Sequence, residues 1–436
     1  MRQVRLTEET KNNILEDLLK RSPNSYGQYE NTVNEIINTV REKKDQALFD
    51  YTLQFDKVAI NKDTIQVTED EIKEAYDAVS PELLSVIRAS KQNIIEFHEK
   101  QKKNSWFDYK PGIILGQKIS PVESAGVYVP GGKAVYPSSV LMNVIPAKVA
   151  GVERIVMTTP PGKDGKVSPN TLVAAKEAGV TEIYKVGGAQ AIAALAFGTE
   201  SIKSVNKIVG PGNIFVALAK KAVFGYVSID SIAGPSEILV LADETANPRF
   251  VAADLLSQAE HDEMAAAILV TTSETLAQQV SDEIDGFLKV LSRSEIIEKS
   301  LENYGYALIA EDLQSAIDVA NEIASEHLEI MTKDPFDTMT RIKNAGAIFL
   351  GSYSSEPLGD YFAGPNHILP TNGTAKFFSP LTVDDFTKKS SIISYSKENL
   401  MAVHNQIESF AKAESLTAHA NSIAVRFETC DNKVNE

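Results

Sequence analysis

The chain is poor in cysteine, in basic charge and in long apolar runs. Its single cysteine, Cys430, excludes an internal disulfide and a zinc site built from several thiolates, so a bound metal would need nitrogen and oxygen ligands. The 43 Lys and Arg residues against 59 Asp and Glu argue against a nucleic-acid partner. No apolar run is long enough to cross a bilayer, and residues 1–21 lack the apolar core of a signal peptide. We therefore expect a cytoplasmic protein without a membrane partner.

The sequence does contain a regular alternation of apolar runs and helical segments. Its 436 residues are enough for two or three domains, and its 43% hydrophobic content is enough for real cores. Helical spacing of apolar residues predicts helices over 7–20, 29–55 and 68–102. From about Tyr109 to Asp230, short strand-like runs, several ending in glycine turns, alternate with helices, and the alternation returns over 237–351. This order predicts an α/β fold with parallel sheets covered by helices on both faces.

Two regions interrupt this pattern. The stretch from Ser352 to about Pro380 is irregular and too long to be a passive connector in a compact domain. The last fifty residues are polar, with helical segments predicted at 384–387, 397–414 and around 416–419. This tail is too small and polar for a core of its own, so we expect it to pack on another domain or another chain.

The segment DLLSQAEH, residues 254–261, is the first candidate for a site. Asn247-Pro248 is a helix-start signal, because Asn can cap a helix and Pro fits its first position. Gln258 and His261 are three residues apart, so both side chains would leave the same helix face. An amide oxygen and an imidazole could then meet on one metal ion or polar ligand. The alternative is an ordinary solvated helix face.

Further candidates lie in the second half of the chain. In SEHLEI, Glu326 and His327 could share general base catalysis, although such a pair can also be ordinary surface residues. Asp360 and His367 lie in a glycine-rich irregular loop, where binding residues concentrate. The alternative there is an Asp-containing turn. The tail segment ESLTAHAN carries a Glu and a His that would, by themselves, be solvated helix residues.

Three glycine turns follow strand-like runs in YVPGG, VGGAQA and VGPGN. Each could present backbone N–H groups to a phosphate at the start of a helix. None is a G-x-G-x-x-G fingerprint or a phosphate-binding loop, and tight strand-to-helix turns explain them equally well. The related segment AGPSEIL places Ser236, a possible hydrogen-bonding partner, at a strand start.

Taken together, these motifs resemble the histidinol dehydrogenase family. The likeness covers essentially the whole chain, and the order and spacing of its motifs agree. The motifs are YVPGG, VGGAQAIAALAFGTE, VGPGN, AGPSEIL, DLLSQAEH, SEHLEI, GDYFAGPNHILPT and ESLTAHAN. The resemblance implies a zinc-dependent enzyme that oxidises L-histidinol through L-histidinal to L-histidine with two NAD⁺, the last two steps of histidine biosynthesis.

The resemblance also implies roles for individual residues. The acid–base pair would be Glu326 and His327. The zinc ligands would be Gln258, His261, Asp360 and His419, with one Zn²⁺ per subunit. The metal would hold the small-molecule substrate by its amine and imidazole, without generating the nucleophile. Substrate contacts would come from Ser236, Gln258, His261, His327, Asp360, His367, Glu414 and His419. NAD⁺ would contact Tyr128, Gln190 and Asn213.

For the fold, the resemblance implies two incomplete Rossmann-like domains with small helical segments at both ends. The predicted boundaries are an N-terminal segment over 1–24, a discontinuous α/β domain over 25–107 and 237–381, a second α/β domain over 108–236, and a tail over 382–436. The family implies a homodimer that exchanges this tail, so that Glu414 and His419 would complete the partner's site.

This chemistry agrees with the residue types. Alcohol oxidation needs a base near the hydroxyl, which suits His327, and the second oxidation needs water added to the aldehyde, which Glu326 could activate. An N/O-ligated zinc suits an imidazole-bearing substrate and would fix its orientation. Two alternatives are a zinc hydrolase that uses Glu326 to activate a metal-bound water, and a binding protein without catalysis.

Overall fold

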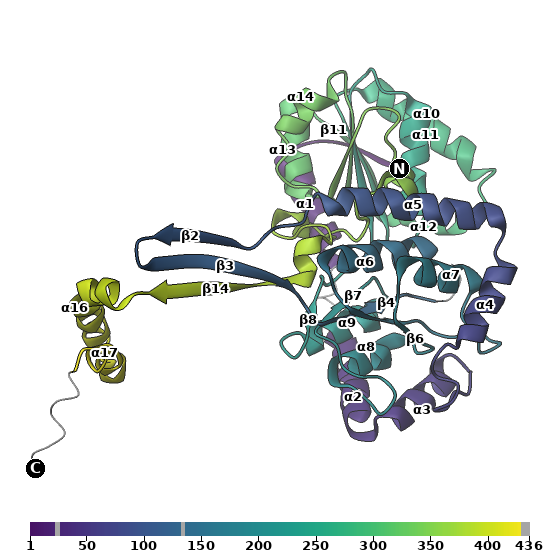
Figure 1. The fold of residues 1–436 in the computed structure, drawn as a ribbon. Coiled ribbons are helices and arrows are strands. Elements are labelled where there is room, and N and C mark those ends of the chain that lie inside the picture. The colour runs from purple at the N-terminus through teal and green to yellow at the C-terminus, as the bar shows by residue number, and fades with distance from the viewer. Residues whose placement is uncertain (22–26, 132–135, 429–436) are drawn as a thin grey trace, which may run out of the picture. The chain divides into compact units, whose positions relative to one another are not determined.

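The computed structural model describes residues 1–21, 27–131 and 136–428, which fall into two compact units (Figure 1). Unit 1 comprises Met1–Lys102 and Val122–Phe386, and unit 2 comprises Lys103–Pro121 with the described part of Thr387–Glu436. Cys430 and Gly132 lie outside the described residues. No helix among those described is long and apolar enough to span a membrane.

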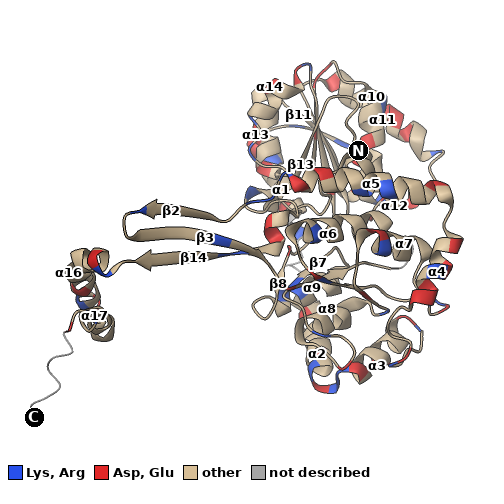
Figure 2. Ribbon diagram, in the orientation of Figure 1, with Lys and Arg blue, Asp and Glu red and all other residues tan. Residues whose placement is uncertain are grey.

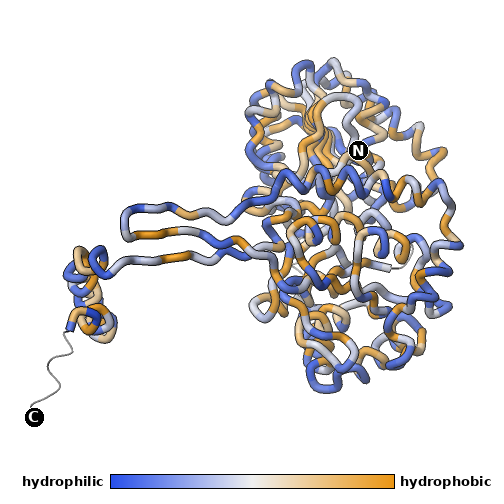
Figure 3. The backbone as a smooth tube through the Cα atoms, in the orientation of Figure 1, coloured by the Kyte–Doolittle hydropathy of each residue, from blue (hydrophilic) through white to orange (hydrophobic). Residues whose placement is uncertain are grey.

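Unit 1 contains a parallel six-stranded sheet, in the order β1-β11-β10-β9-β12-β13. The strands are β1 (Arg2–Arg5), β9 (Glu237–Ala242), β10 (Ala266–Thr271), β11 (Gly305–Ile309), β12 (His327–Met331) and β13 (Ala347–Leu350). The faces are covered by α10 (Pro248–Ala259), α11 (Glu274–Leu288) and α12 (Ser294–Tyr304) on one side, and by α1 (Glu8–Lys20) and α13 (Leu313–Ile323) on the other. The central strands β10, β9 and β12 are buried, and Figure 3 shows mainly hydrophobic residues in this sheet. Burial on both faces is what a parallel sheet requires.

A second parallel sheet of unit 1 has the order β6-β5-β4-β7-β8. Its strands are β4 (Ser124–Tyr128), β5 (Arg154–Thr158), β6 (Glu182–Tyr184), β7 (Lys207–Val209) and β8 (Ser228–Ile229). One face is covered by α4 (Glu69–Ala78), α5 (Pro81–Glu99), α6 (Pro137–Ala150) and α7 (Pro169–Ala178), and the other by α2 (Gly27–Lys43), α3 (Asp45–Phe55), α8 (Gly188–Phe197) and α9 (Ile214–Val223). The predicted α/β class is confirmed.

Helices α2 to α5 lie within residues 25–107, which the prediction groups with residues 237–381. In the structure these helices pack against the five-stranded sheet. These helices contribute Val33, Leu48, Ile87 and Ile94 to the cores of the five-stranded sheet. Amphipathic spacing identifies a helix but not the sheet that receives its apolar face, because that partner is remote in sequence. The division of unit 1 into two α/β domains stays a prediction.

Local start and stop signals act as expected. Asn247 caps α10 by accepting a hydrogen bond from Arg249 N at 3.0 Å, and Pro248 occupies the first helical position. α7 begins at Pro169 and ends before Gly179, whose φ of 90° needs a glycine. Acidic and basic residues are both spread over the helices of the unit (Figure 2).

Unit 2 contains an antiparallel sheet in the order β14-β3-β2, followed by two helices. The elements are β2 (Trp106–Lys110), β3 (Ile113–Pro121), β14 (Thr387–Tyr395), α16 (Lys397–Ala413) and α17 (Thr417–Ala424). Two predictions are corrected here. The tail is not wholly helical, because β14 lies within it, and residues 112–119 pair with that strand instead of joining the second α/β domain. The pairing joins segments far apart in sequence, which local periodicity does not reveal.

Candidate active site

Glu326 and His327 lie at the amino end of β12, next to the start of β9. After α13 ends, Ala324 adopts a left-handed conformation with φ of 54°, and this turn leads the chain into β12. His327 pairs in register with Ile238 of β9, so the segment before β9 faces the catalytic candidates. The two residues are buried, with 6% and 3% of their surface exposed. They are therefore not the ordinary surface pair that was the alternative.

The backbone of Glu237 holds both side chains. Its N–H donates to Glu326 Oε2 at 3.0 Å, and its carbonyl oxygen accepts from His327 Nδ1 at 3.3 Å. Because a carbonyl only accepts, Nδ1 carries the proton and Nε2 carries a lone pair. This Nε2 atom is buried and has no hydrogen-bond partner among the described residues. It is placed to accept a proton from a bound molecule.

The buried environment shifts the pKa values of both side chains, Glu326 and His327, away from their ordinary values. Burial lowers the pKa of His327 to about 3, so the imidazole is unprotonated at neutral pH and its Nε2 lone pair is free of a proton. Burial, together with the nearby carboxyls of Glu237 and Asp360, raises the pKa of Glu326 well above its usual range. The Glu237 N–H opposes this shift by donating to the carboxylate. Strongly shifted groups gathered in one place are typical of active sites.

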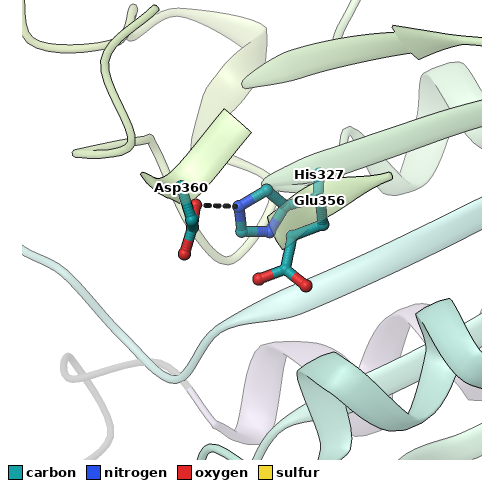
Figure 4. Close-up of side chains that lie close together, drawn as sticks. All are labelled: His327, Glu356 and Asp360. Atoms are coloured by element: carbon teal, nitrogen blue, oxygen red, sulfur yellow. Dashed lines mark ion pairs between the residues drawn. The ribbon is translucent and has the colours of Figure 1, made fainter. Parts of the chain in front are cut away.

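Asp360 and Glu356 face His327 from the irregular stretch that follows β13. Asp360 lies in η2 (Gly359–Ala363), and its Oδ1 is 3.9 Å from His327 Nε2 (Figure 4). Burial raises the pKa of Asp360 to about 7. Glu356, in the short helix α15 (Glu356–Leu358), accepts a hydrogen bond from Ser257 Oγ at 2.5 Å. Ligand atoms of the three residues lie within 4.8 Å of one another and could hold a metal ion.

Glu356 is a residue that sequence reasoning missed. It stands at the first position of α15 and belongs to none of the motifs singled out, so no local signal marked it. The structure brings it to the site because its backbone N–H donates to Glu329 Oε1 of β12 at 2.7 Å.

Gln258 and His261 meet as their spacing predicted. α10 ends at Ala259, and a backbone hydrogen bond of 3.2 Å from His261 N to Gln258 O continues the turn. Gln258 Nε2 and His261 Nδ1 are 2.8 Å apart. Gln258 is fully buried, and its Oε1 has no hydrogen-bond partner in the described part of the chain. A buried amide oxygen without a partner beside an imidazole fits a metal ligand set of nitrogen and oxygen.

His367 and Ser236 border the same cluster. His367 Nδ1 donates to the backbone oxygen of Asp360 at 3.1 Å, and its Nε2 is 3.4 Å from Ser139 Oγ in α6. Burial lowers the pKa of His367 to about 4. Ser236 immediately precedes β9, and its side chain hydrogen-bonds Glu326. The cluster thus reaches from the six-stranded sheet to a helix of the five-stranded sheet.

The two predicted site residues of the tail belong to unit 2. Glu414 follows α16 at its C-cap, and His419 lies in the first turn of α17. Both side chains are exposed. Unit 1 by itself therefore brings together Gln258 and His261, and places Asp360 beside His327 and His367, whereas the fourth predicted ligand comes from unit 2.

A cavity of about 1070 Å³ lies beside the five-stranded sheet and is lined by Tyr128, Gln190 and Asn213. The strand order reverses between β4 and β7, and ligands of α/β folds bind beyond the carboxyl ends of strands at such a reversal. Tyr128, at the end of β4, accepts a hydrogen bond from Gly188 N at 3.1 Å. Gln190 Oε1 is buried without a partner among the residues described. The three residues predicted to contact NAD⁺ thus share one cavity.

Close packing explains the first glycine of the turn VGPGN, residues 209–213. At Gly210, φ is 119°, and an added Cβ would lie 2.1 Å from the carbonyl oxygen of Tyr128. Only glycine lets the turn approach β4 this closely. Asn213 then caps α9 by accepting hydrogen bonds from Phe215 N and Val216 N at 3.1 and 3.2 Å.

Comparison with known proteins agrees with this geometry. The family model of histidinol dehydrogenase matches residues 19–427. Histidinol dehydrogenase of Caldanaerobacter subterraneus subsp. tengcongensis is 58% identical over 421 residues, covering 97% of this chain and 98% of that protein. The Bacillus subtilis enzyme is 59% identical over 396 residues, covering 91% and 92%. The crystal structure of histidinol dehydrogenase from Elizabethkingia anophelis has a TM-score of 0.92 at 38% identity and covers 98% of each chain. The chain is therefore an oxidoreductase that belongs to the histidinol dehydrogenase family.

Proposed function

We propose that this protein oxidises L-histidinol to L-histidine through L-histidinal, with NAD⁺ as the electron acceptor and zinc as the resident metal. The observation that carries the proposal is the neutral, buried His327 with an unpartnered Nε2, among the residues described, beside a cluster of metal-ligand side chains. The family and the close relatives named above support the same substrate.

His327 serves as the base in both oxidations. Its Nδ1–H is committed to the carbonyl of Glu237, so Nε2 takes the proton of the substrate hydroxyl as the carbon–hydrogen bond breaks. Glu326 acts before the second oxidation, when water adds to the aldehyde. Its raised pKa makes the carboxylate a stronger base than an exposed glutamate, so it can take a proton from that water.

Gln258, His261, Asp360 and His419 would hold the zinc. The buried Oε1 of Gln258, unpartnered within the described ranges, and the adjacent imidazole of His261 fit this role. When bound, zinc would supply a Lewis-acidic centre that orients an imidazole- and amine-bearing substrate. Ser236 and His367 lie close enough to the cluster to contact the rest of that substrate.

The cavity beside the five-stranded sheet would hold NAD⁺, which supplies the hydride acceptor. Tyr128, Gln190 and Asn213 would contact it. Because Asn213 uses its side-chain oxygen to cap α9, its amide nitrogen is left as a donor toward the cavity. The buried Gln190 Oε1, which lacks a partner among the described residues, can accept a hydrogen bond from the cofactor.

The functional assembly would be a homodimer in which unit 2 of each chain completes the partner's site. Support comes from large apolar side chains exposed on unit 2, with exposures of 52% at Trp106, 69% at Tyr109, 74% at Ile393 and 71% at Phe410. Such exposure on a small unit favours an interface. Glu414 and His419 would then reach the active site of the other chain.

The primary test is NADH formation from L-histidinol, followed by its absorbance, with and without a chelator. We expect two NADH per histidinol, loss of activity after metal removal, and recovery with Zn²⁺. A zinc hydrolase would show no NAD⁺ dependence, and an inert binding protein would form no NADH. Either result would refute the proposal.

Site sharing is tested by mixing two inactive variants, His261→Ala and His419→Ala. Hybrid dimers would contain one intact site, so activity should recover toward about a quarter of the wild-type value. Absence of any recovery, with hybrids demonstrated by mass spectrometry, would show that each chain builds its own site.

A further inference from the structure

Arg21 is a fully buried cation that reaches the segment before β9. It follows α1, and its exposed fraction is 0%. Its Nη2 donates to the carbonyl oxygens of Pro235 and Ser236 at 2.9 and 3.0 Å, and its Nη1 is 3.4 Å from Glu237 Oε2. One guanidinium therefore holds three consecutive residues.

These are the residues on which the candidate active site depends. Ser236 hydrogen-bonds Glu326, and the N–H and carbonyl of Glu237 hold Glu326 and His327. A shift of this segment would move both catalytic candidates together, because one peptide segment positions them. Arg21 contacts neither of them through any hydrogen bond or ion pair found among the described residues, so its effect would be indirect.

The geometry requires an arginine in particular. Glu237 is also buried, with 1% of its surface exposed, and its other oxygen accepts from Gly373 N at 3.4 Å. Burying a cation is costly unless its donors find acceptors, and here Nη1 and Nη2 of the planar fork serve two carbonyls and one carboxylate, whereas Nε has no hydrogen-bond partner among the described residues. A lysine has one ammonium group on a flexible stem and does not reproduce this fork. The Tyr304 ring, 5.1 Å from the guanidinium carbon, further fixes its position.

We propose that Arg21 is a positioning residue for catalysis, which sets the backbone of Ser236 and Glu237 and thereby the geometry of the Glu326–His327 pair. The proposal rests on the proposed function, in which that pair performs the chemistry. It assigns a catalytic consequence to the first helical segment of the chain, which lies far in sequence from every site motif.

The test compares Arg21→Lys with the wild type in zinc-loaded enzyme, with histidinol and histidinal supplied separately. We expect kcat of both oxidations to fall together by about 10²-fold, since a displacement on the order of 1 Å costs that much, while KM for NAD⁺ stays near the wild-type value. A simultaneous loss is the signature of positioning, because a change confined to Glu326 would affect the second step more.

Arg154→Lys is the matched control. Arg154 also pairs with a carboxylate, Glu182 at 2.6 Å, and donates to two carbonyls, those of Lys203 and Ser204, but at the start of β5 away from the site. The Arg154→Lys variant should lose stability but keep the wild-type kcat per folded molecule. The folded fraction is measured by circular dichroism. Equal kcat losses in the two variants at equal folded fractions would overturn the proposal.

A second variant covers the case in which Arg21→Lys does not fold. Glu237→Gln keeps the side-chain shape and the backbone groups but removes the charge that faces Arg21, and we expect kcat of both steps to fall about tenfold. Wild-type kcat in a folded variant of either residue would refute the positioning role. Failure of the wild type itself to form NADH would instead refute the proposed function.

Discussion

Replacing Glu326 with glutamine separates the two oxidations. The glutamine is isosteric, and its carbonyl oxygen can still accept the hydrogen bond that Glu237 N donates at 3.0 Å, so the side chain should keep its place. What is lost is the ability to take a proton from water. General base catalysis typically contributes about 10²–10⁴-fold, which is about 3–5 kcal/mol of barrier for the second oxidation. The first oxidation, for which His327 is the base, should proceed at about the wild-type rate.

The same substitution changes how the stability of the protein depends on pH. Burial raises the pKa of Glu326 in the folded chain, so folding opposes ionisation of this carboxyl. Its contribution to stability is fully present below the ordinary glutamate pKa of about 4.3 and is lost as the pH rises through the folded value. Glutamine does not titrate. In metal-free protein, the melting temperature of Glu326→Gln relative to wild type should therefore increase as the pH rises above the ordinary glutamate pKa.

Both effects are measurable with purified protein. NADH formation is followed with histidinol and with histidinal as separate substrates, and thermal unfolding is followed by circular dichroism in the presence of a chelator. Equal loss of the two oxidations would refute the division of labour between Glu326 and His327. A melting-temperature difference that does not change with pH would show that the buried carboxyl is not the titrating group.

Two further predictions concern the cofactor turn and a buried histidine. Gly210→Ala should destabilise the fold by about 3 kcal/mol or more, because the added Cβ meets the Tyr128 carbonyl oxygen at 2.1 Å. It should also raise KM for NAD⁺. Urea unfolding measures the loss of stability. Gly225→Ala, with φ of 100° and no neighbour of its Cβ within 4 Å among the described atoms, is the control and should cost about 1 kcal/mol. Similar losses in the two variants would contradict the clash. Burial lowers the pKa of His98, so the unfolded state binds a proton first, and stability falls as the pH drops below about 6.5. His98→Gln should show a shallower decline in urea midpoint between about pH 6.5 and pH 5, and an unchanged slope would refute this assignment.

Sequence by itself determined the features that depend on near neighbours. Asn247 and Pro248 start α10 as expected, and the spacing of Gln258 and His261 brings their side chains within 2.8 Å, because three residues make almost one helical turn. The alternation of strands, glycine turns and helices likewise predicted the α/β class, since burial on both faces leaves its mark on each strand. Family motifs supplied residue roles that spacing alone left open.

Tertiary structure decided the contacts between segments that are remote along the chain. Glu237 lies in the motif AGPSEIL, yet its role arises from its backbone groups, which hold Glu326 and His327 across adjacent strands. Glu356 and Arg21 carry no local signal at all, and β14 was hidden in a tail that reads as helical. Periodicity and capping report which face of an element is apolar and where it ends. They do not report which distant element packs against it, and that packing is what assembles the site and buries its charges.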